Sequence, residues 1–168
     1  EKKLNFLVIN DPKKITSSSA ALGVYNPITG KRFVETWTAK KIISTTEKFY
    51  PRIEKKLGEN FFNKKKIYRP FINNKMINDW QIRSESKDYE KYITKLEFES
   101  KYKITHDNLG GVTTNKSGYL NVNKFIDLTK KYLESNNHYK EISIKSDDIL
   151  LKKNHIKLHE LNTKYLIF

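Results

Sequence analysis

Residues 17–32 read SSSAALGVYNPITGKR and follow a nearly continuous apolar run at Leu4–Ile9. Such a run is typical of a strand buried on both faces of a parallel sheet. Asn10, Asp11 and Pro12 end it, because these residues favour turns and Pro cannot continue a strand ladder. In residues 17–32, hereafter the small-residue segment, short side chains let backbone N–H groups come close to a large flat ligand. The order of strand, loop and small-residue segment predicts an α/β protein that binds such a ligand.

The small-residue segment resembles the second conserved block of FAD-dependent oxidoreductases of the D-amino-acid oxidase and glycine oxidase group. In that group, a strand ending in an acidic residue precedes a sequence of the kind S-S-x-A-A-x-G-x-x-N-P-x-T-G-x-R. The resemblance is specific over residues 17–32, moderate over 118–133 and weak elsewhere. It implies an α/β fold in which an α+β substrate domain is inserted into a Rossmann-like FAD-binding domain.

The resemblance also implies a division of the chain. Residues 1–37 would hold the second strand and the small-residue segment of the FAD-binding domain, 38–117 a portion of the substrate domain, and 118–168 a return helix and small β-meander. The first strand and the G-x-G-x-x-G turn that admits the pyrophosphate in such folds are absent, and no Met begins the chain. We therefore expect an internal piece of a larger flavoprotein, which alone binds FAD weakly and is inactive.

The same resemblance assigns site residues, although it leaves the catalytic residues unknown. Its cofactor-binding candidates are Asn10, Ser18, Ser19, Ala20, Ala21, Gly23 and Asn26. Asn10 stands where the family usually carries Asp or Glu for the adenosine ribose, and its amide can still bond a hydroxyl. Turn formation at a strand end is the alternative role for Asn10. The candidates on the substrate side are Tyr25, Arg32 and Arg69, with a solvated or structural ion pair as the alternative for the two arginines.

The function that the resemblance implies is oxidation of a small amine or amino acid, either a D-amino acid or a glycine-like substrate. FAD would accept the hydride, and the protein would orient the substrate. From local chemistry alone, the small-residue segment also suits an ordinary helix start capped by serine and packed by alanines. The substrate's identity and the electron acceptor are not assigned.

The strongly basic composition supports a second hypothesis. The chain has 33 Lys and Arg against 19 Asp and Glu, a formal net charge of +14. This suits a non-enzymatic module that binds nucleic acid or an acidic partner through Lys-rich helices over 40–56 and 124–131. Only four of the basic residues are arginine, the residue preferred for bidentate phosphate and guanine contacts, so nucleic-acid binding is not favoured. A third hypothesis, action on modified tRNA bases, would use both flavin and positive charge.

Several classes of site and location lack support in the composition. The chain has no Cys, so it forms no disulfide and no thiolate metal site. Its four histidines have no accompanying acidic ligand pattern, so no metal site is expected. No apolar run approaches membrane-spanning length, so we expect a cytoplasmic protein without a membrane span.

Hydrophobic spacing predicts the remaining elements. A helix is expected from an N-cap at Thr38 to a glycine C-cap at Gly58, with Pro51 kinking or splitting it. A second well-patterned helix begins after Asn121. Other helical segments are expected at 75–84 and 88–93. Strands are expected at 66–72, 102–104, 110–114, 139–144, 149–152, 156–159 and 165–168.

Overall fold

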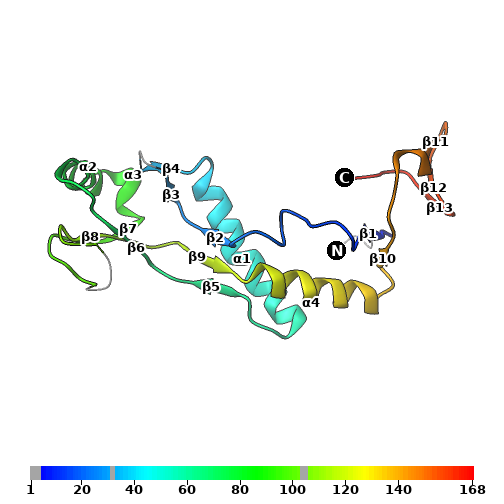
Figure 1. The fold of residues 1–168 in the computed structure, drawn as a ribbon, viewed down its shortest axis with the longest axis horizontal. Helices are drawn as coiled ribbons and strands as arrows, with labels where there is room; N and C mark the ends of the chain where they lie inside the picture. The colour runs from blue at the N-terminus through cyan, green and yellow to red at the C-terminus, as the bar shows by residue number, and fades with distance from the viewer. Residues whose placement is uncertain (1–4, 31–32, 103–105) are drawn as a thin grey trace. The chain divides into compact units, whose positions relative to one another are not determined.

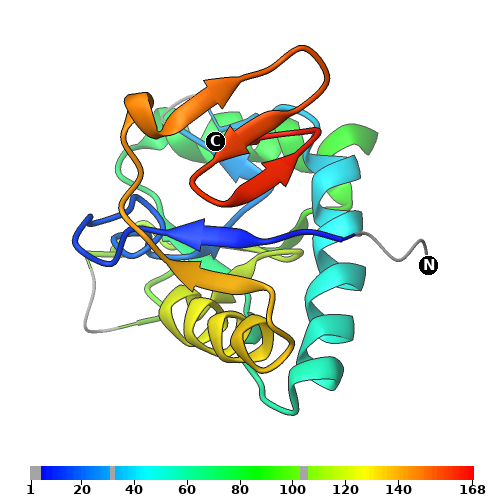
Figure 2. The same ribbon diagram turned by 90° about the vertical axis from the view of Figure 1, so that its right-hand side faces the viewer.

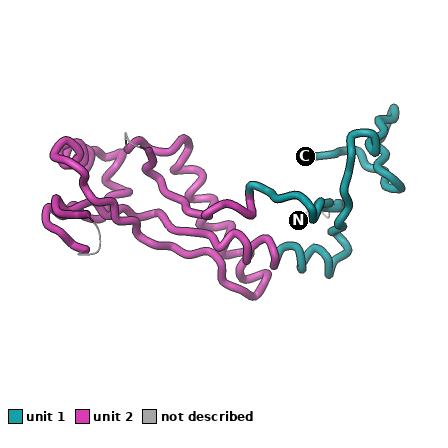
Figure 3. Tube along the Cα trace, viewed as in Figure 1, with its two compact units in different colours: residues 1–17, 129–168 teal, residues 18–128 magenta. Residues whose placement is uncertain are grey.

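The computed structural model describes residues 5–30, 33–102 and 106–168. The chain divides into two compact units, unit 1 (1–17 and 129–168) and unit 2 (18–128), coloured in Figure 3. It is a mixed α/β protein with 32% helix, 25% strand and small sheets, which confirms the predicted α/β class. The unit boundaries fall inside the predicted segments 1–37 and 118–168. The Rossmann-like FAD-binding domain with its inserted substrate domain stays a prediction.

Unit 2 is built from short strands and three complete helices (Figure 1). Its elements are β2 (Val24–Tyr25), β3 (Ile28–Thr29), β4 (Val34–Glu35), α1 (Ala39–Leu57), β5 (Phe62–Lys64), β6 (Ile67–Pro70), α2 (Asn74–Ser84), α3 (Lys87–Glu90), β7 (Ile93–Glu97), β8 (Gly111–Thr114), β9 (Gly118–Leu120) and part of α4 (Val122–Ser135). The strands form two three-stranded antiparallel sheets, ordered β2-β9-β5 and β6-β8-β7, and the hairpin β3-β4.

One hydrophobic cluster joins α2, the β6-β8-β7 sheet and the β3-β4 hairpin. Its buried members are Ile28, Phe71, Met76, Trp80, Tyr92 and Val112. Met76 and Trp80 lie four residues apart and therefore share one face of α2. The Phe33 ring packs against Trp80 with 5.2 Å between ring centroids. This cluster thus fixes the hairpin that carries Phe33 against α2.

The predicted helix at Thr38–Gly58 is confirmed as α1. Gly58 ends it in the left-handed region (φ 75°), as expected for a glycine C-cap. Thr38 is the N-cap residue, but its side chain makes no capping bond, because Thr38 itself adopts left-handed backbone angles. Of the two effects predicted for Pro51, a split is wrong, since α1 continues through it, and a kink stays a prediction. Tyr50, the residue before Pro51, packs on Phe62 and Phe125 at 5.3 and 5.5 Å and holds this part of the helix in place.

Asp107, which the sequence did not single out, organises the chain between β7 and β8. Its carboxylate is fully buried and accepts hydrogen bonds from Ser100 Oγ at 2.6 Å, the Lys101 and Tyr102 amides at 2.8 and 2.7 Å, and Tyr68 Oη at 3.1 Å. These bonds, that from Ser100 first, lower the pKa of Asp107 to about 2. Asp107 is therefore ionised and anchors this loop.

Gly23, a predicted cofactor contact, is required by the packing of the chain itself. Its φ is 70°, and a Cβ at this position would lie 2.1 Å from the carbonyl oxygen of Leu120. The Gly23 carbonyl also accepts a 2.9 Å hydrogen bond from the Leu120 amide. Glycine here lets the small-residue segment enter β2 directly beside β9.

Replacing Gly23 with alanine tests this explanation. The left-handed backbone angle costs a non-glycine residue about 1–3 kcal/mol, and we expect the close approach to Leu120 to add to that loss of unfolding free energy. Gly30→Ala is the matched control, because Gly30 has φ 72° but no atom within 4 Å of the point that a Cβ would occupy. Urea unfolding followed by circular dichroism compares the two variants. Equal losses would contradict the role of the close approach.

Unit 1 pairs two strands that are far apart in the sequence. β1 (Val8–Asn10) lies parallel to β10 (Tyr139–Glu141), with Val8 opposite Tyr139 (Figure 2). The parallel pairing agrees with the prediction, but burial on both faces does not, since Val8 is 38% exposed. Among the described residues β1 has one partner strand, so one of its two edges is not paired with a strand.

The end of unit 1 is a small antiparallel meander of β11 (Ile149–Leu151), β12 (Ile156–Leu158) and β13 (Leu161–Thr163), preceded by the 3-10 turn η1 (Ser146–Asp148). The first two strands confirm the prediction. The predicted third strand at 165–168 is wrong: Leu158 pairs with Leu161 around a two-residue turn, in which His159 has φ 51°. Residues 161–163 therefore occupy the place beside β12 that was expected for 165–168. The strand expected at 102–104 falls largely outside the described residues.

Candidate functional site

The small-residue segment begins as a tight, exposed turn. The Ala21 amide donates to the Ser18 carbonyl at 3.2 Å, and no described residue of the segment is helical. The alternative of a serine-capped helix start is therefore wrong. The side chains of Ser18, Ser19, Ala20 and Ala21 face solvent, and so does the apolar Leu22. Small exposed side chains next to the exposed Leu22 leave the backbone open to contact with a flat ligand.

Asn10, the candidate for the adenosine ribose, belongs to unit 1. It pairs with Glu141 at the end of β1, and its carbonyl accepts a 3.0 Å hydrogen bond from the Ile142 amide. The adjacent Asp11 accepts from Ser143 Oγ at 2.8 Å, and this bond is the main cause of a lowered Asp11 pKa. The other cofactor candidates lie in unit 2, so the joint role of Asn10 with them stays a prediction.

Three predicted residues line one pocket of unit 2: the adjacent Tyr25 and Asn26, and Arg69 from a distant part of the chain. This Tyr25 pocket has a volume of about 470 Å³. Its lining residues are Val24, Tyr25, Asn26, Thr29, Gly30, Thr36, Ala39, Ile42, Ile43 and Arg69. The small-residue segment thus shares a cavity wall with Arg69 of β6. Arg32, the remaining substrate-side candidate, lies outside the described residues.

Tyr25 and Asn26 have different roles in this wall. The Tyr25 ring stacks on Phe62 at 5.2 Å, and its buried hydroxyl has no hydrogen-bond partner among the described residues. Burial, with a smaller effect of the Glu47 charge, raises the pKa of Tyr25 to about 12, so its hydroxyl stays a neutral donor. Asn26 Oδ1 accepts from the Ile28 amide at 3.1 Å and shapes the turn between β2 and β3.

Arg69 is a half-buried cation that lacks an anionic partner within the described part of the chain. Its guanidinium lies 5.0 Å from the centre of the Phe33 ring, and Nη1 donates a long 3.5 Å hydrogen bond to the Gly30 carbonyl. Burial lowers the pKa of Arg69, because its charge is partly removed from water. The ion pair expected as the alternative role of Arg69 is not formed with any described residue.

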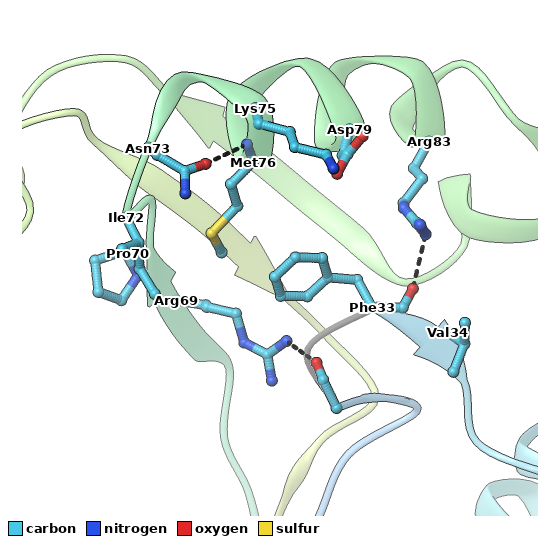
Figure 4. A pocket seen from close by; sticks show the side chains of 11 residues that line it. Phe33, Val34, Arg69, Pro70, Ile72, Asn73, Lys75, Met76, Asp79 and Arg83 are labelled. Carbon is cyan, nitrogen blue, oxygen red and sulfur yellow. Dashed lines mark hydrogen bonds between the residues drawn. The ribbon is translucent and has the colours of Figure 1, made fainter.

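A second and larger pocket adjoins the first, with Gly30 and Arg69 in both walls. This Phe33 pocket has a volume of about 840 Å³ and is drawn in Figure 4. Its lining residues are Gly30, Phe33, Val34, Arg69, Pro70, Ile72, Asn73, Lys75, Met76, Asp79 and Arg83. Arg83 Nη1 donates to the Phe33 carbonyl at 2.9 Å, and its guanidinium lies 5.3 Å from the centre of the Tyr89 ring. Arg83 thereby supports Phe33, whose φ is 51°.

Sequence reasoning did not identify Phe33, Asp79 or Arg83. A partial signal was present, because Asp79 and Arg83 lie three and seven residues after Met76 and so continue one side of α2. Nothing local connects that side of α2 with Phe33, more than forty residues earlier.

Neither a metal centre nor a membrane span is evident in the described ranges. No three His, Asp or Glu side chains there gather closely enough to hold a metal ion. No helix in the same ranges is both long and apolar enough to cross a bilayer. In comparisons with known proteins, the chain matches no protein-family model and no solved structure.

Proposed function

We propose that the chain is part of an FAD-dependent oxidoreductase that oxidises a small amine bearing a carboxylate, such as a D-amino acid or a glycine-like compound. Two findings support this proposal. The small-residue segment resembles such flavoenzymes over its whole length. Tyr25 and Asn26 of that segment share a pocket with Arg69, a half-buried cation without an anionic partner in the described chain, and this observation carries the proposal.

The residues of the Tyr25 pocket suit a substrate carboxylate. A guanidinium presents parallel N–H groups that bind both oxygens of a carboxylate, and a carboxylate would restore the interaction that burial takes from Arg69. Tyr25 contributes its ring to this wall, while its hydroxyl is buried and stays neutral. The exposed backbone of Ser18–Ala21 would hold the cofactor. FAD, when bound, would supply the two-electron oxidant.

Cofactor content tests the proposal directly. We expect the 168-residue chain to retain little FAD on purification, and the protein translated with any coding sequence upstream of Glu1 to retain it stoichiometrically. The visible absorption bands of flavin in each purified protein provide the measurement. Absence of flavin from both proteins, even after incubation with excess FAD, would overturn the proposal.

Arg69→Met is expected to weaken binding of the carboxylate-bearing substrate by at least about tenfold. A charge-assisted hydrogen bond contributes about 1.5–3 kcal/mol, and tenfold corresponds to about 1.4 kcal/mol. The dependence of flavin reduction on amino-acid concentration in the FAD-containing protein gives the affinity. Arg52→Met is the control, because Arg52 is exposed on α1 and the variant has the same charge change. A similar loss in both variants would assign the effect to net charge.

The basic binding module is kept as a second candidate because of one face of α1. Lys41, Lys48, Arg52 and Lys55 are exposed at helical spacing and form no ion pair with another described residue. The carboxylates of α1 are engaged elsewhere: Glu47 pairs with Lys64, and Glu54 accepts the amides of Phe61 and Phe62. Binding to a labelled single-stranded RNA that weakens steeply with added salt would favour this candidate.

A further inference from the structure

Four cations form a stripe along one exposed face of α1 (cyan in Figure 1). The members of this basic stripe are Lys41, Lys48, Arg52 and Lys55. They lie seven, four and three residues apart in turn, and such spacing places side chains on one side of a helix. At 1.5 Å per residue, the stripe extends for about 21 Å. Because none of the four is paired with a described acid, the stripe presents a row of available positive charges.

An exposed tryptophan lies at the N-terminal end of this stripe. Trp37 directly precedes Thr38, the N-cap residue of α1, and is 85% exposed. Its ring packs against no other aromatic ring in the part of the chain that the structure describes. Flat rings stack on an aromatic face of this kind. Trp37 therefore offers a stacking surface beside the row of cations.

Trp37 also forms part of the wall of a groove that leads into the stripe. This Trp37 groove has a volume of about 870 Å³, and the first turns of α1 contribute Lys40, Lys41, Ser44 and Thr45 to it. Lys41 thus belongs to both the groove and the basic stripe. A ligand that places a ring against Trp37 can therefore continue along the exposed face of α1.

The acidic residues of the Trp37 groove do not cancel its positive charge. Glu35 is one of them, and its carboxylate is already paired with Lys91, with 3.9 Å between Oε1 and Nζ. Asp88 of α3 is the other acid among the described wall residues. Lys40 and Lys41 are both exposed and form no ion pair within the described ranges. The groove therefore keeps a net positive charge, and its ligand is an anion.

A chain of phosphates that carries flat bases complements these features together. Proteins that bind single strands combine a basic track for the backbone with aromatic side chains on which bases stack. In a duplex the bases are stacked on one another, so a single strand is the form that offers a base to Trp37. The scarcity of arginine disfavours bidentate reading of base edges, but lysine contacts to phosphate and stacking do not require it.

An anionic membrane surface fits the same face less well. Between Lys41 and Lys48 the face carries the exposed hydroxyl side chains of Ser44 and Thr45. A helix that lies in a bilayer surface instead buries a continuous apolar face in the lipid. Charge alone would attract both partners, whereas the groove beside a free tryptophan ring favours the nucleic acid.

We propose that the Trp37 groove and the basic stripe bind single-stranded nucleic acid. One base stacks on Trp37, and the phosphates that follow it lie along Lys41, Lys48, Arg52 and Lys55. This inference rests on the second candidate function, the basic binding module, and names its partner. It uses neither FAD nor Arg69, so it holds whether or not the chain belongs to a flavoenzyme.

Fluorescence anisotropy with labelled probes tests the inference on the 168-residue chain. The probes are oligouridylate and oligothymidylate of about twelve nucleotides, within the usual range of single-strand sites, and a duplex of the same length. At least one single strand is expected to bind at least about fivefold more tightly than the duplex, since it can stack on Trp37. The tighter of the two strands assigns the sugar of the partner. A duplex that binds as tightly as both strands would overturn the inference.

Trp37→Ala tests the stacking contact. The variant is expected to bind the tighter single strand at least about fivefold more weakly and the duplex unchanged. Trp37→Phe keeps an aromatic ring and should retain most of the affinity. Because Trp37 is exposed, neither change is expected to affect folding, and circular dichroism checks this. Unchanged single-strand binding by Trp37→Ala would remove the stacked base from the proposal and contradict it.

Lys48→Gln tests the phosphate contacts. Each phosphate neutralised on a single strand contributes about 0.7 to the slope of log affinity against log salt concentration, so this variant should lower the slope by about 0.7. Lys153→Gln is the matched control, because Lys153 is exposed in unit 1 and belongs to neither the groove nor the stripe. An equal fall in slope for both variants would assign the effect to net charge and overturn the placement on α1.

Two further polyanions separate this inference from the function on which it rests. Polyglutamate with about as many charges as the probe, or vesicles rich in phosphatidylserine, are expected to bind more weakly than the single strand because they offer no base. Equal or tighter binding of either would overturn the nucleic-acid partner and keep the basic module. Absence of binding to every polyanion at low salt would overturn both. The flavin content of the purified protein reports separately on the oxidoreductase.

Discussion

Replacement of Trp80 with alanine is expected to lower the free energy of unfolding by about 3–5 kcal/mol, the usual loss for a large aromatic removed from a core. Trp80 is 1% exposed and lies at the centre of the cluster that joins α2, the β6-β8-β7 sheet and the β3-β4 hairpin. Its neighbours Ile28 and Val112 come from different strands, so they cannot collapse into the cavity together. The Phe33 pocket would lose its support as well, because the Phe33 ring packs on Trp80.

The chain provides its own control in its second tryptophan. Trp37 is 85% exposed, and Trp37→Ala should change stability by no more than about 0.5 kcal/mol. Trp80→Phe should cost less than Trp80→Ala, since it keeps an aromatic ring and removes an N–H that has no partner among the described residues. Urea unfolding followed by circular dichroism measures all three variants. Equal losses for the two alanine variants would show that Trp80 is not a core residue.

Asp107→Asn is expected to lower the melting temperature by several degrees at neutral pH. The carboxylate accepts four hydrogen bonds, including those from Ser100 and Tyr68, and an amide side chain has one acceptor oxygen in place of two. Bonds to a charged acceptor are also the stronger ones. The loop between β7 and β8 would lose its anchor.

The pH dependence of this effect follows from the lowered pKa. An unfolded aspartate titrates near 3.9, whereas Asp107 in the folded chain has a pKa of about 2. The folded state therefore favours the ionised form, and this stabilisation is complete above about pH 4 and is lost as the pH falls toward 2. Melting temperatures of the unmodified chain and the variant, measured from pH 7 downward, should converge across that window.

Two variants separate this network from general effects of charge. Tyr68→Phe removes one of the four donors and should give a smaller loss than Asp107→Asn. Asp88→Asn changes an exposed acid of unit 2 and should leave the melting temperature nearly unchanged. A difference between Asp107→Asn and the unmodified chain that stays constant down to pH 2 would contradict the explanation.

Elements with local signals were predictable from the sequence. Helix α1 has a glycine C-cap and a regular apolar face, and Asn121 accepts the Lys124 amide at 3.1 Å as a capping residue should. The wrong predictions concern strands whose pairing depends on residues far away in the sequence. The third strand of the meander was misplaced at 165–168 because the turn at His159 sets its register. β1 was expected to be buried because an apolar pattern does not tell how many strands pair with it, and within the described residues one does.

The residues of the candidate site likewise fall into those that were predicted from the sequence and those that depend on tertiary packing. Tyr25, Asn26 and Arg69 were predicted from a resemblance and from residue type, and the structure places them around one pocket. Asp79 and Phe33 escaped prediction because their meeting depends on the core around Trp80. In the sequence, neither a single acidic residue on a helix such as Asp79 nor a phenylalanine after a glycine turn such as Phe33 indicates a binding site. Tertiary packing gives both their setting.

The parallel pairing of β1 with β10 also places a constraint on how the chain is made. Val8–Asn10 can pair only after Tyr139–Glu141 has left the ribosome. At about 5–20 residues per second, translation of the intervening chain takes on the order of ten seconds. Unit 2 is contiguous and can complete its core during that interval, while β1 presents an unpaired strand edge to the cell's chaperones and to neighbouring nascent chains. β1 is thus synthesised before unit 2 but reaches its partner strand only after unit 2 has been made.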